Sequence, residues 1–207
     1  MTIPVATPLR QRDHMRPTIP SIALGIVLCT TAAALAQPSA AAADDDPFRR
    51  GRWHVEFGTD AALEAWNYNA NHEELYGLLE GLTYGLRDGL VVTMSQRVVY
   101  VSQRAQDTWL LGLTGGIRGR VYQRNRFSAF LGIEVGISDA AIAAPPRGTR
   151  FNYLVIGSAG SLVRLAPRAH LKSGLQWTHV SNNGLKDASR NPDIEAIGLT
   201  LGVLIRL

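Results

Sequence analysis

Three residues near the end of the chain have the side-chain types of a hydrolytic triad. His179 and Ser181 stand two positions apart, and Glu195 follows them after a polar loop. A serine can act as a nucleophile when a histidine takes its proton, and a carboxylate can orient that histidine and stabilise its charged form. The spacing alone is weak evidence, because His-x-Ser pairs also occur at solvated strand ends. The elements that carry the three residues must therefore decide whether they meet.

Both segments that flank the polar loop alternate in the way that β-strands do, with every second residue on one face. In residues 171–181, the face of His179 and Ser181 also carries Leu171, Ser173, Leu175 and Trp177. From residue 195 onward, the face of Glu195 also carries Ile197, Leu199, Leu201, Val203, Ile205 and Leu207. The candidate triad thus lies at one end of a long apolar face. Ionisable residues on a lipid-facing surface are costly and tend to mark function.

The N-terminal region has the pattern of a secretory signal peptide. Arg10, Arg12 and Arg16 precede an apolar run over residues 22–28, and small residues follow at the spacing of a cleavage site. We predict that residues 1–43 form the signal, with cleavage after Ala36 or Ala43. Met15 is an alternative start. Residues 44–207 then form a single domain.

Composition narrows the classes of function. The one cysteine, Cys29, lies within the predicted signal, so the mature chain lacks the means for a disulfide, a thiol nucleophile or a cysteine-ligated metal. The net charge of +4 is scattered, which argues against nucleic-acid binding. The histidines have no ligand spacing typical of zinc. We therefore expect neither a metal nor a cofactor.

The mature chain reads as about eight short alternating segments separated by turn-prone clusters. A soluble β-sandwich is one interpretation. Three features favour an eight-stranded antiparallel transmembrane β-barrel of the outer membrane. Charged residues recur opposite the apolar face, glycines recur there too, and aromatic residues lie near strand ends. The charged residues are Arg118, Arg120, Glu134, Arg164, Lys172 and Arg206, and the aromatic ones are Trp53, Trp109, Phe127, Phe151, Tyr153 and Trp177.

The C-terminal segment resembles a known family. The run His179-Val-Ser-Asn-Asn-Gly-Leu185, followed by Asn191-Pro-Asp-Ile-Glu195 and a final apolar strand, is similar to the motif of the lipid A 3-O-deacylase (PagL) family. The resemblance covers about the last thirty residues. It implies an eight-stranded outer-membrane barrel with the triad on its outer wall. Ser181 is then the nucleophile, His179 the general base and Glu195 the residue that orients the histidine.

The same resemblance implies further roles around the triad. Asn182 matches the family asparagine beside the oxyanion hole, whose N–H donors come from the backbone around Asn183 and Gly184. The substrate is lipid A, the membrane anchor of lipopolysaccharide, which lies among the outer-membrane lipids. Its acyl chains are expected against Trp177, Leu175, Leu199 and Leu201. The reaction is hydrolysis of the 3-O-linked hydroxyacyl ester through an acyl-enzyme, without a cofactor.

The sequence departs from the family in two places and leaves several alternatives open. The loop over residues 186–190 is longer than in the family, and the chain ends in Leu207 where many outer-membrane barrels end in an aromatic residue. A non-catalytic structural or adhesion barrel and an outer-membrane phospholipase are the alternative functions. A homodimer, the acyl position and the chain length also stay open.

Overall fold

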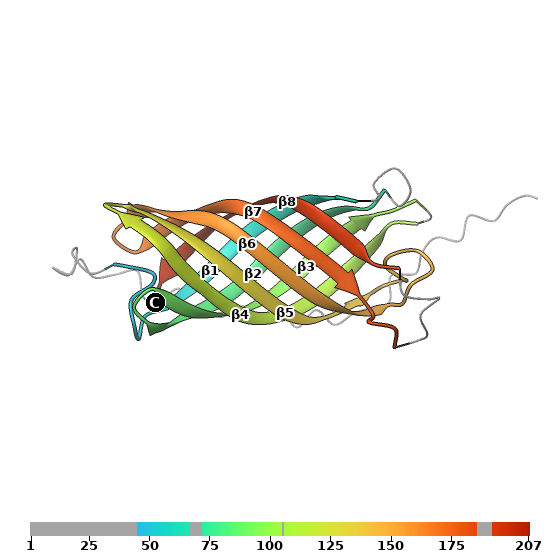
Figure 1. Cartoon of the computed structure of the whole chain (residues 1–207), viewed down its shortest axis with the longest axis horizontal. Helices are drawn as coiled ribbons and strands as arrows, with labels where there is room; N and C mark the ends of the chain where they lie inside the picture. The colour runs from blue at the N-terminus through green and yellow to red at the C-terminus, as the bar shows by residue number, and fades with distance from the viewer. Residues whose placement is uncertain (1–44, 67–71, 105, 186–191) are drawn as a thin grey trace, which may run out of the picture. The chain divides into compact units, whose positions relative to one another are not determined.

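The computed structural model describes residues 45–66, 72–104, 106–185 and 192–207, and these fold into a closed barrel in which each strand pairs with its neighbours in sequence (Figure 1). All the pairings are antiparallel, and β1 closes the barrel against β8. The prediction of an eight-stranded antiparallel barrel is confirmed. The strands are β1 (Trp53–Glu64), β2 (Glu74–Arg87), β3 (Leu90–Ser102), β4 (Thr108–Arg124), β5 (Phe127–Ala140), β6 (Phe151–Ala166), β7 (Ala169–Ser181) and β8 (Ile194–Arg206).

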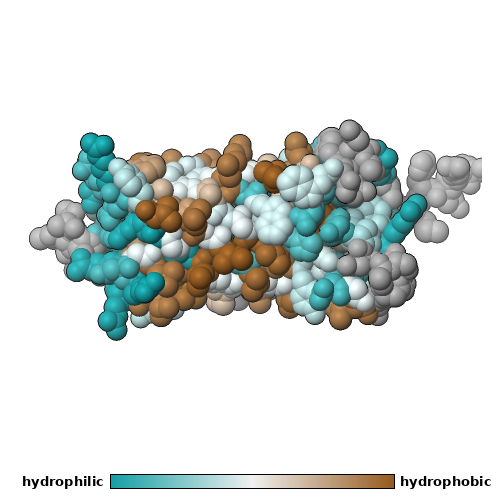
Figure 2. All heavy atoms as spheres, in the orientation of Figure 1, coloured by the Kyte–Doolittle hydropathy of each residue, from teal (hydrophilic) through white to brown (hydrophobic). Residues whose placement is uncertain are grey.

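The outer wall carries the apolar residues that the alternation predicted. Large apolar side chains point outward along β4, β5, β7 and β8, and Figure 2 shows them gathered between hydrophilic ends. The six aromatic residues expected near strand ends are all exposed on this wall. Because the side-chain period of a strand is two, a one-residue slip would have turned this whole set inward. The assignment of inner and outer faces is therefore confirmed.

The middle of the barrel interior holds a network of ion pairs. Glu56 lies between Arg118, at 2.9 Å, and Lys172, and it forms a salt bridge with each. Arg97 bridges Asp60 at 3.0 Å and Glu134 at 3.3 Å. Buried charges are tolerable only when they are paired and hydrogen-bonded, and this network pairs them across the lumen.

Glycines on the inner face make room for this network. Gly77 faces Asp60, and a Cβ atom added at Gly77 would lie 2.4 Å from a carboxylate oxygen of that residue. Any larger residue at position 77 would therefore displace the Asp60 side chain. The expected recurrence of small residues on the inner face has this spatial cause.

The interior is less polar than the sequence predicted, because an apolar layer lies on each side of the ion pairs. One layer, which includes Leu75, Val101, Val180 and Ile194, lies near the ends of β1, β3, β5 and β7. The other packs Phe48 against Val91, Phe130, Leu162 and Leu204. The expectation of a lumen filled by small and polar residues is corrected accordingly. The inward apolar residues of β2 and β3 also explain why those segments alternate weakly in sequence.

The two ends of the barrel differ in their connections. Two residues join β2 to β3, β4 to β5 and β6 to β7, whereas residues 65–73, 103–107, 141–150 and 182–193 connect the strands at the other end. Gly89 (φ 86°) and Asn125 (φ 52°) supply the left-handed conformation that tight hairpins need. In outer-membrane barrels the short turns face the periplasm and the longer loops face the outside. The candidate triad is at the long-loop end, and the chain's C-terminus is at the other.

Among the described residues, no helix is long and apolar enough to cross a membrane. The predicted signal peptide (residues 1–43) and the departure over residues 186–190 lie outside the described part of the chain.

Candidate active site

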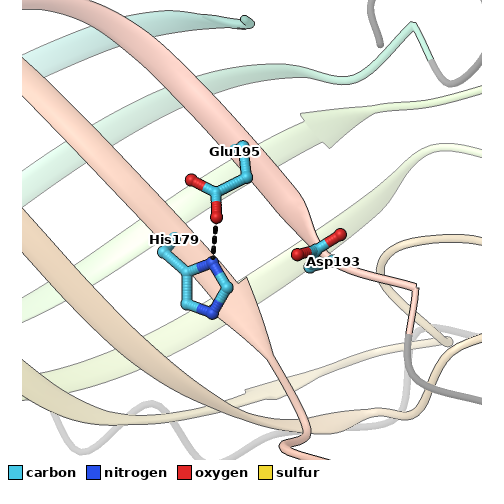
Figure 3. A group of neighbouring side chains, drawn as sticks. All are labelled: His179, Asp193 and Glu195. Carbon is cyan, nitrogen blue, oxygen red and sulfur yellow. Dashed lines mark hydrogen bonds and ion pairs between the residues drawn. The ribbon is translucent and has the colours of Figure 1, made fainter. Parts of the chain in front are cut away.

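The barrel register places the candidate base and acid directly opposite each other. His179 on β7 pairs with Glu195 on β8, and both point outward from the wall. The Nδ1 atom of His179 lies 2.7 Å from Oε1 of Glu195 (Figure 3). The two side chains are 25% and 20% exposed, so they are partly shielded but reachable from outside. The structure thus brings together two of the three residues that the sequence singled out.

The indole of Trp177 holds this pair on a second side. Its Nε1–H donates a 2.6 Å hydrogen bond to Oε2 of Glu195. The indole ring also lies nearly parallel to the imidazole of His179, at 23° and 6.0 Å between ring centroids. Both carboxylate oxygens of Glu195 therefore have a partner. We predict that Trp177 contacts substrate, and the structure adds a hydrogen bond from Trp177 to Glu195. The position of Trp177 on the same face as His179, two residues before it, is the sequence signal for this added contact.

Ser181 is the last residue of β7, shortly before a turn over residues 183–185. It is buried, and its register partner on β6 is Tyr153. Its hydroxyl accepts a 3.1 Å hydrogen bond from the backbone N–H of Asn183. An accepted bond of this kind does not use the proton of the hydroxyl. By strand alternation Ser181 shares the face of His179, two residues further along β7, but it is only 6% exposed.

The turn after Ser181 differs in detail from an open oxyanion hole. Asn183 (φ 52°) and Gly184 (φ 73°) both adopt the left-handed conformation. The N–H of Gly184 donates to the Asn182 side-chain oxygen at 2.9 Å, and the N–H of Asn183 points at Ser181. Both donors are therefore engaged within the turn. The oxyanion role of Asn182, Asn183 and Gly184 stays a prediction, with Asn183 already directed at the candidate nucleophile.

Inward neighbours anchor the strands that carry the site. Val180 and Ile194 pair across β7 and β8, and both are fully buried in the apolar layer at this end. Burying each such side chain contributes about 1.5–3 kcal/mol. Next to them, Asn182 donates to the Thr149 hydroxyl at 3.1 Å, and Glu64 accepts the N–H of Glu195 at 2.9 Å. Thr149 and Glu64 could not be predicted from the sequence, because their contacts join residues that are distant in the chain.

The hydrogen bond to Glu195 sets the tautomer of His179. An ionised carboxylate only accepts hydrogen bonds, so Nδ1 is the donor in this contact. In the neutral imidazole the Nε2 atom then carries the lone pair, and it points away from Glu195 (Figure 3). This arrangement suits a general base that takes a proton at Nε2 while the carboxylate stabilises the imidazolium.

A third acidic side chain, Asp193, lies close to this pair (Figure 3). One ligand atom from each of His179, Asp193 and Glu195 lies within 4.8 Å of the others, so the three could hold a divalent cation. The sequence indicated this grouping only through the shared parity of Asp193 and Glu195, and we did not predict it. The expectation that the site works without a metal stays a prediction.

Behind the site, the acidic residue Glu73 lies in the connection before β2. Burial, together with the nearby negative charge of Glu64, raises the pKa of the Glu73 carboxyl to about 7. Since Glu64 also accepts the N–H of Glu195, this side of the site is rich in carboxyl groups.

An apolar ladder runs down the wall from the acid–base pair. Trp177 pairs with Ile197, and below them Leu175 pairs with Leu199, at 59% and 65% exposure. Leu201 continues the ladder opposite Ser173. The residues that we expected to contact an acyl chain are therefore contiguous on the outer wall.

No protein-family model matches this chain, and neither does any curated protein. Several solved structures are similar to it. The outer-membrane enzyme PagL is 14% identical, with a TM-score of 0.55 over 71% of this chain and 97% of PagL. The outer membrane protein OprG from Pseudomonas aeruginosa is 14% identical, with a TM-score of 0.51 over 79% of this chain and 99% of OprG. Neisserial surface protein A (NspA) is 10% identical, with a TM-score of 0.54 over 75% of this chain and 96% of NspA.

At these sequence identities the structural similarity shows the fold alone, so any activity has to be argued from the residues of the site. Of these three proteins, one is described as an enzyme and the other two as an outer membrane protein and a surface protein. The chain is thus an eight-stranded antiparallel β-barrel of the outer-membrane type.

Proposed function

We propose that this protein is an outer-membrane esterase that hydrolyses the 3-O-linked acyl chain of lipid A. The observation that carries the proposal is the 2.7 Å hydrogen bond between His179 and Glu195 on the outward face of the wall, with Ser181 two residues along the same strand. This face is at the long-loop end, where the outer leaflet of the membrane would lie. A likeness in fold to the outer-membrane enzyme PagL supports the proposal.

The first chemical step follows from the tautomer of His179. Nε2 takes the proton of Ser181 as the hydroxyl oxygen attacks the ester carbonyl, and Glu195 stabilises the imidazolium. The Asn183 N–H, directed at Ser181 Oγ, would turn to the developing oxyanion. Loss of one such donor typically costs about a hundredfold or more in rate. The protonated histidine then gives its proton to the leaving sugar hydroxyl, and water hydrolyses the acyl-enzyme.

The wall accounts for where the acyl chain would lie. Leu175, Leu199 and Leu201 form exposed apolar surface directly below the acid–base pair. A chain lying along them stays in hydrocarbon while its ester reaches Ser181. The proposed reaction therefore needs no extraction of the lipid from the membrane.

The test is hydrolysis of defined lipids by the purified barrel in detergent, followed by mass spectrometry. We expect release of one hydroxyacyl chain from lipid A, and loss of this activity in Ser181→Ala and in His179→Ala. Ser173→Ala is the matched control, because Ser173 lies on the same face of β7. Full activity of a folded Ser181→Ala protein would refute the mechanism. Release of fatty acid from phosphatidylethanolamine alone would identify a phospholipase, and no hydrolysis of either lipid would leave a non-catalytic barrel.

A further inference from the structure

A groove lies beside the candidate nucleophile, on the side away from Glu195. It has a volume of about 690 Å³, within the range of small-molecule sites. Its lining includes Asp139, Gly148, Thr149, Arg150, Phe151 and Asn182. Asn182 directly follows Ser181, and Phe151 is on β6 two residues before Tyr153, the register partner of Ser181. The groove is therefore continuous with the candidate site.

The wall of the groove is held by hydrogen bonds to the strand ends. Asn182 is bonded to Thr149 at 3.1 Å, and Thr149 donates to the carbonyl of Phe151 at 2.7 Å. The buried Asn152 side chain donates to the carbonyl of Ala144 at 2.9 Å, which ties the loop over residues 141–150 to β6. Arg150 donates from Nε to the carbonyl of Ala140 at 2.7 Å. A site held in this way is formed before a ligand arrives, which lowers the entropic cost of binding.

Charge divides the surroundings of Ser181 into two sides. The loop over residues 141–150 contains Arg147 and Arg150 and no acidic residue, and the groove adds one aspartate, Asp139. The opposite side carries Glu195 and Asp193, with Glu64 and Glu73 behind them. An anionic group bound next to Ser181 would be repelled by those carboxylates and attracted by the arginine side.

Arg150 has the chemistry to bind a phosphate. Its guanidinium can offer paired N–H donors to two oxygens of one phosphate. Its side chain is 59% exposed, and one nitrogen, Nη2, is held by the Asp139 carboxylate at 2.9 Å. Asp139 orients the guanidinium, and it also competes with an incoming anion for the same charge.

We propose that this groove binds the phosphorylated sugar headgroup of the lipid substrate, with Arg150 contacting a phosphate. The inference rests on the proposed function and extends it, because it names the element that selects the substrate. The headgroup then lies over the β5–β6 loop, the acyl chain runs down the wall below Trp177, and the ester between them meets Ser181. A lipid without a phosphate on its headgroup would lose the contact with Arg150.

Kinetics on three substrates test this assignment. We expect Arg150→Gln to raise KM for phosphorylated lipid A about tenfold, and to leave hydrolysis of a short p-nitrophenyl ester unchanged. On lipid A whose phosphates have been removed, the variant and the wild type should perform equally. Arg124→Gln is the matched control, because Arg124 is an exposed arginine at the opposite end of the barrel. Asp139→Asn should act in the opposite direction and lower KM for the phosphorylated substrate.

A binding measurement keeps this inference separate from the proposed function. The probe is the phosphorylated glucosamine disaccharide without acyl chains, and its binding to the Ser181→Ala protein is measured by calorimetry. This measurement does not depend on catalytic activity. We expect Arg150→Gln to weaken binding about tenfold and Arg124→Gln to leave it unchanged. Equal effects of the two arginine substitutions would overturn the inference even if lipid A is hydrolysed. Absence of hydrolysis with intact, Arg150-dependent binding would instead refute the esterase and keep the groove.

Discussion

The indole of Trp177 offers a sharp test of the acid–base pair, provided that the proposed function holds. Trp177→Phe keeps an aromatic ring on the wall and beside His179, but it removes the N–H that lies 2.6 Å from Glu195. A hydrogen bond to a charged group is worth about 1.5–3 kcal/mol. The site is partly exposed, and Glu195 keeps its bond to His179, so we expect less than half of that loss to reach the transition state. A three- to tenfold fall in kcat/KM corresponds to about 0.7–1.4 kcal/mol.

The kinetic constants distinguish this orienting role from a general loss of packing. Without the indole N–H, Glu195 keeps its charge and its hydrogen bond to His179 but loses the contact that fixes its second oxygen. We therefore expect a fall in kcat with little change in KM for lipid A. In Glu195→Gln the charge that stabilises the imidazolium is gone, so the fall in kcat should be larger.

The assay is stopped-time hydrolysis of lipid A in detergent at one fixed pH, over a range of lipid A concentrations. Trp109→Phe is the control, because Trp109 is also an exposed wall tryptophan at the long-loop end of the barrel. If Trp177→Phe lowers kcat as much as Glu195→Gln does, the assigned orienting role is wrong. An unchanged kcat in Trp177→Phe would show that the indole does not act on Glu195.

Three further predictions concern the barrel and the chemistry of its outer end. Glu56→Gln leaves Arg118 and Lys172 buried without their carboxylate, so the free energy of unfolding in vesicles should fall by about 3–5 kcal/mol, whereas Glu80→Gln on the outside should change it little. The Glu73 carboxyl binds its proton more tightly in the folded protein, so the free energy of unfolding should fall as pH rises from about 4.5 to about 7. The Glu73→Gln variant should not show this fall, which is up to about 3 kcal/mol. Urea titration at both ends of the pH range measures it. Finally, EDTA should leave lipid A hydrolysis intact, and added Zn²⁺ should inhibit the Asp193→Asn variant less than the wild type. Loss of activity in EDTA and its recovery with Zn²⁺ would instead make His179, Asp193 and Glu195 a catalytic metal site.

Local alternation accounts for most of what the sequence could predict. Period-two patterns are set by neighbouring residues, so the strands and their inner and outer faces were readable without knowing the pairing. The meeting of His179 and Glu195 followed from parity and from a single hairpin loop, because consecutive antiparallel strands pair with each other. The structure added the register that places the two side chains directly opposite each other.

Contacts that depend on barrel closure could not be predicted. Glu56 and Lys172 are 116 residues apart in the chain and meet only because the barrel brings β1 and β7 to face the same lumen. Thr149 and Asn182 are 33 residues apart and come together where two loops end. The inner apolar layers were missed for a related reason, since an inward leucine on β2 looks like a break in the pattern until its partners from other strands are known.

The packed middle of the barrel leaves the outer wall as the place for the proposed chemistry. Between Asp60, Arg97 and Gln176 the cavity measures about 20 Å³, which is room for about one water molecule. Ion pairs and two apolar layers pack around this small cavity. The inward side chains of Val180 and Ile194 therefore anchor the two strands whose opposite face carries His179, Ser181 and Glu195. A rigid wall of this kind can position a nucleophile against a lipid ester without closing around the substrate, which is the arrangement that a reaction within the plane of a membrane requires.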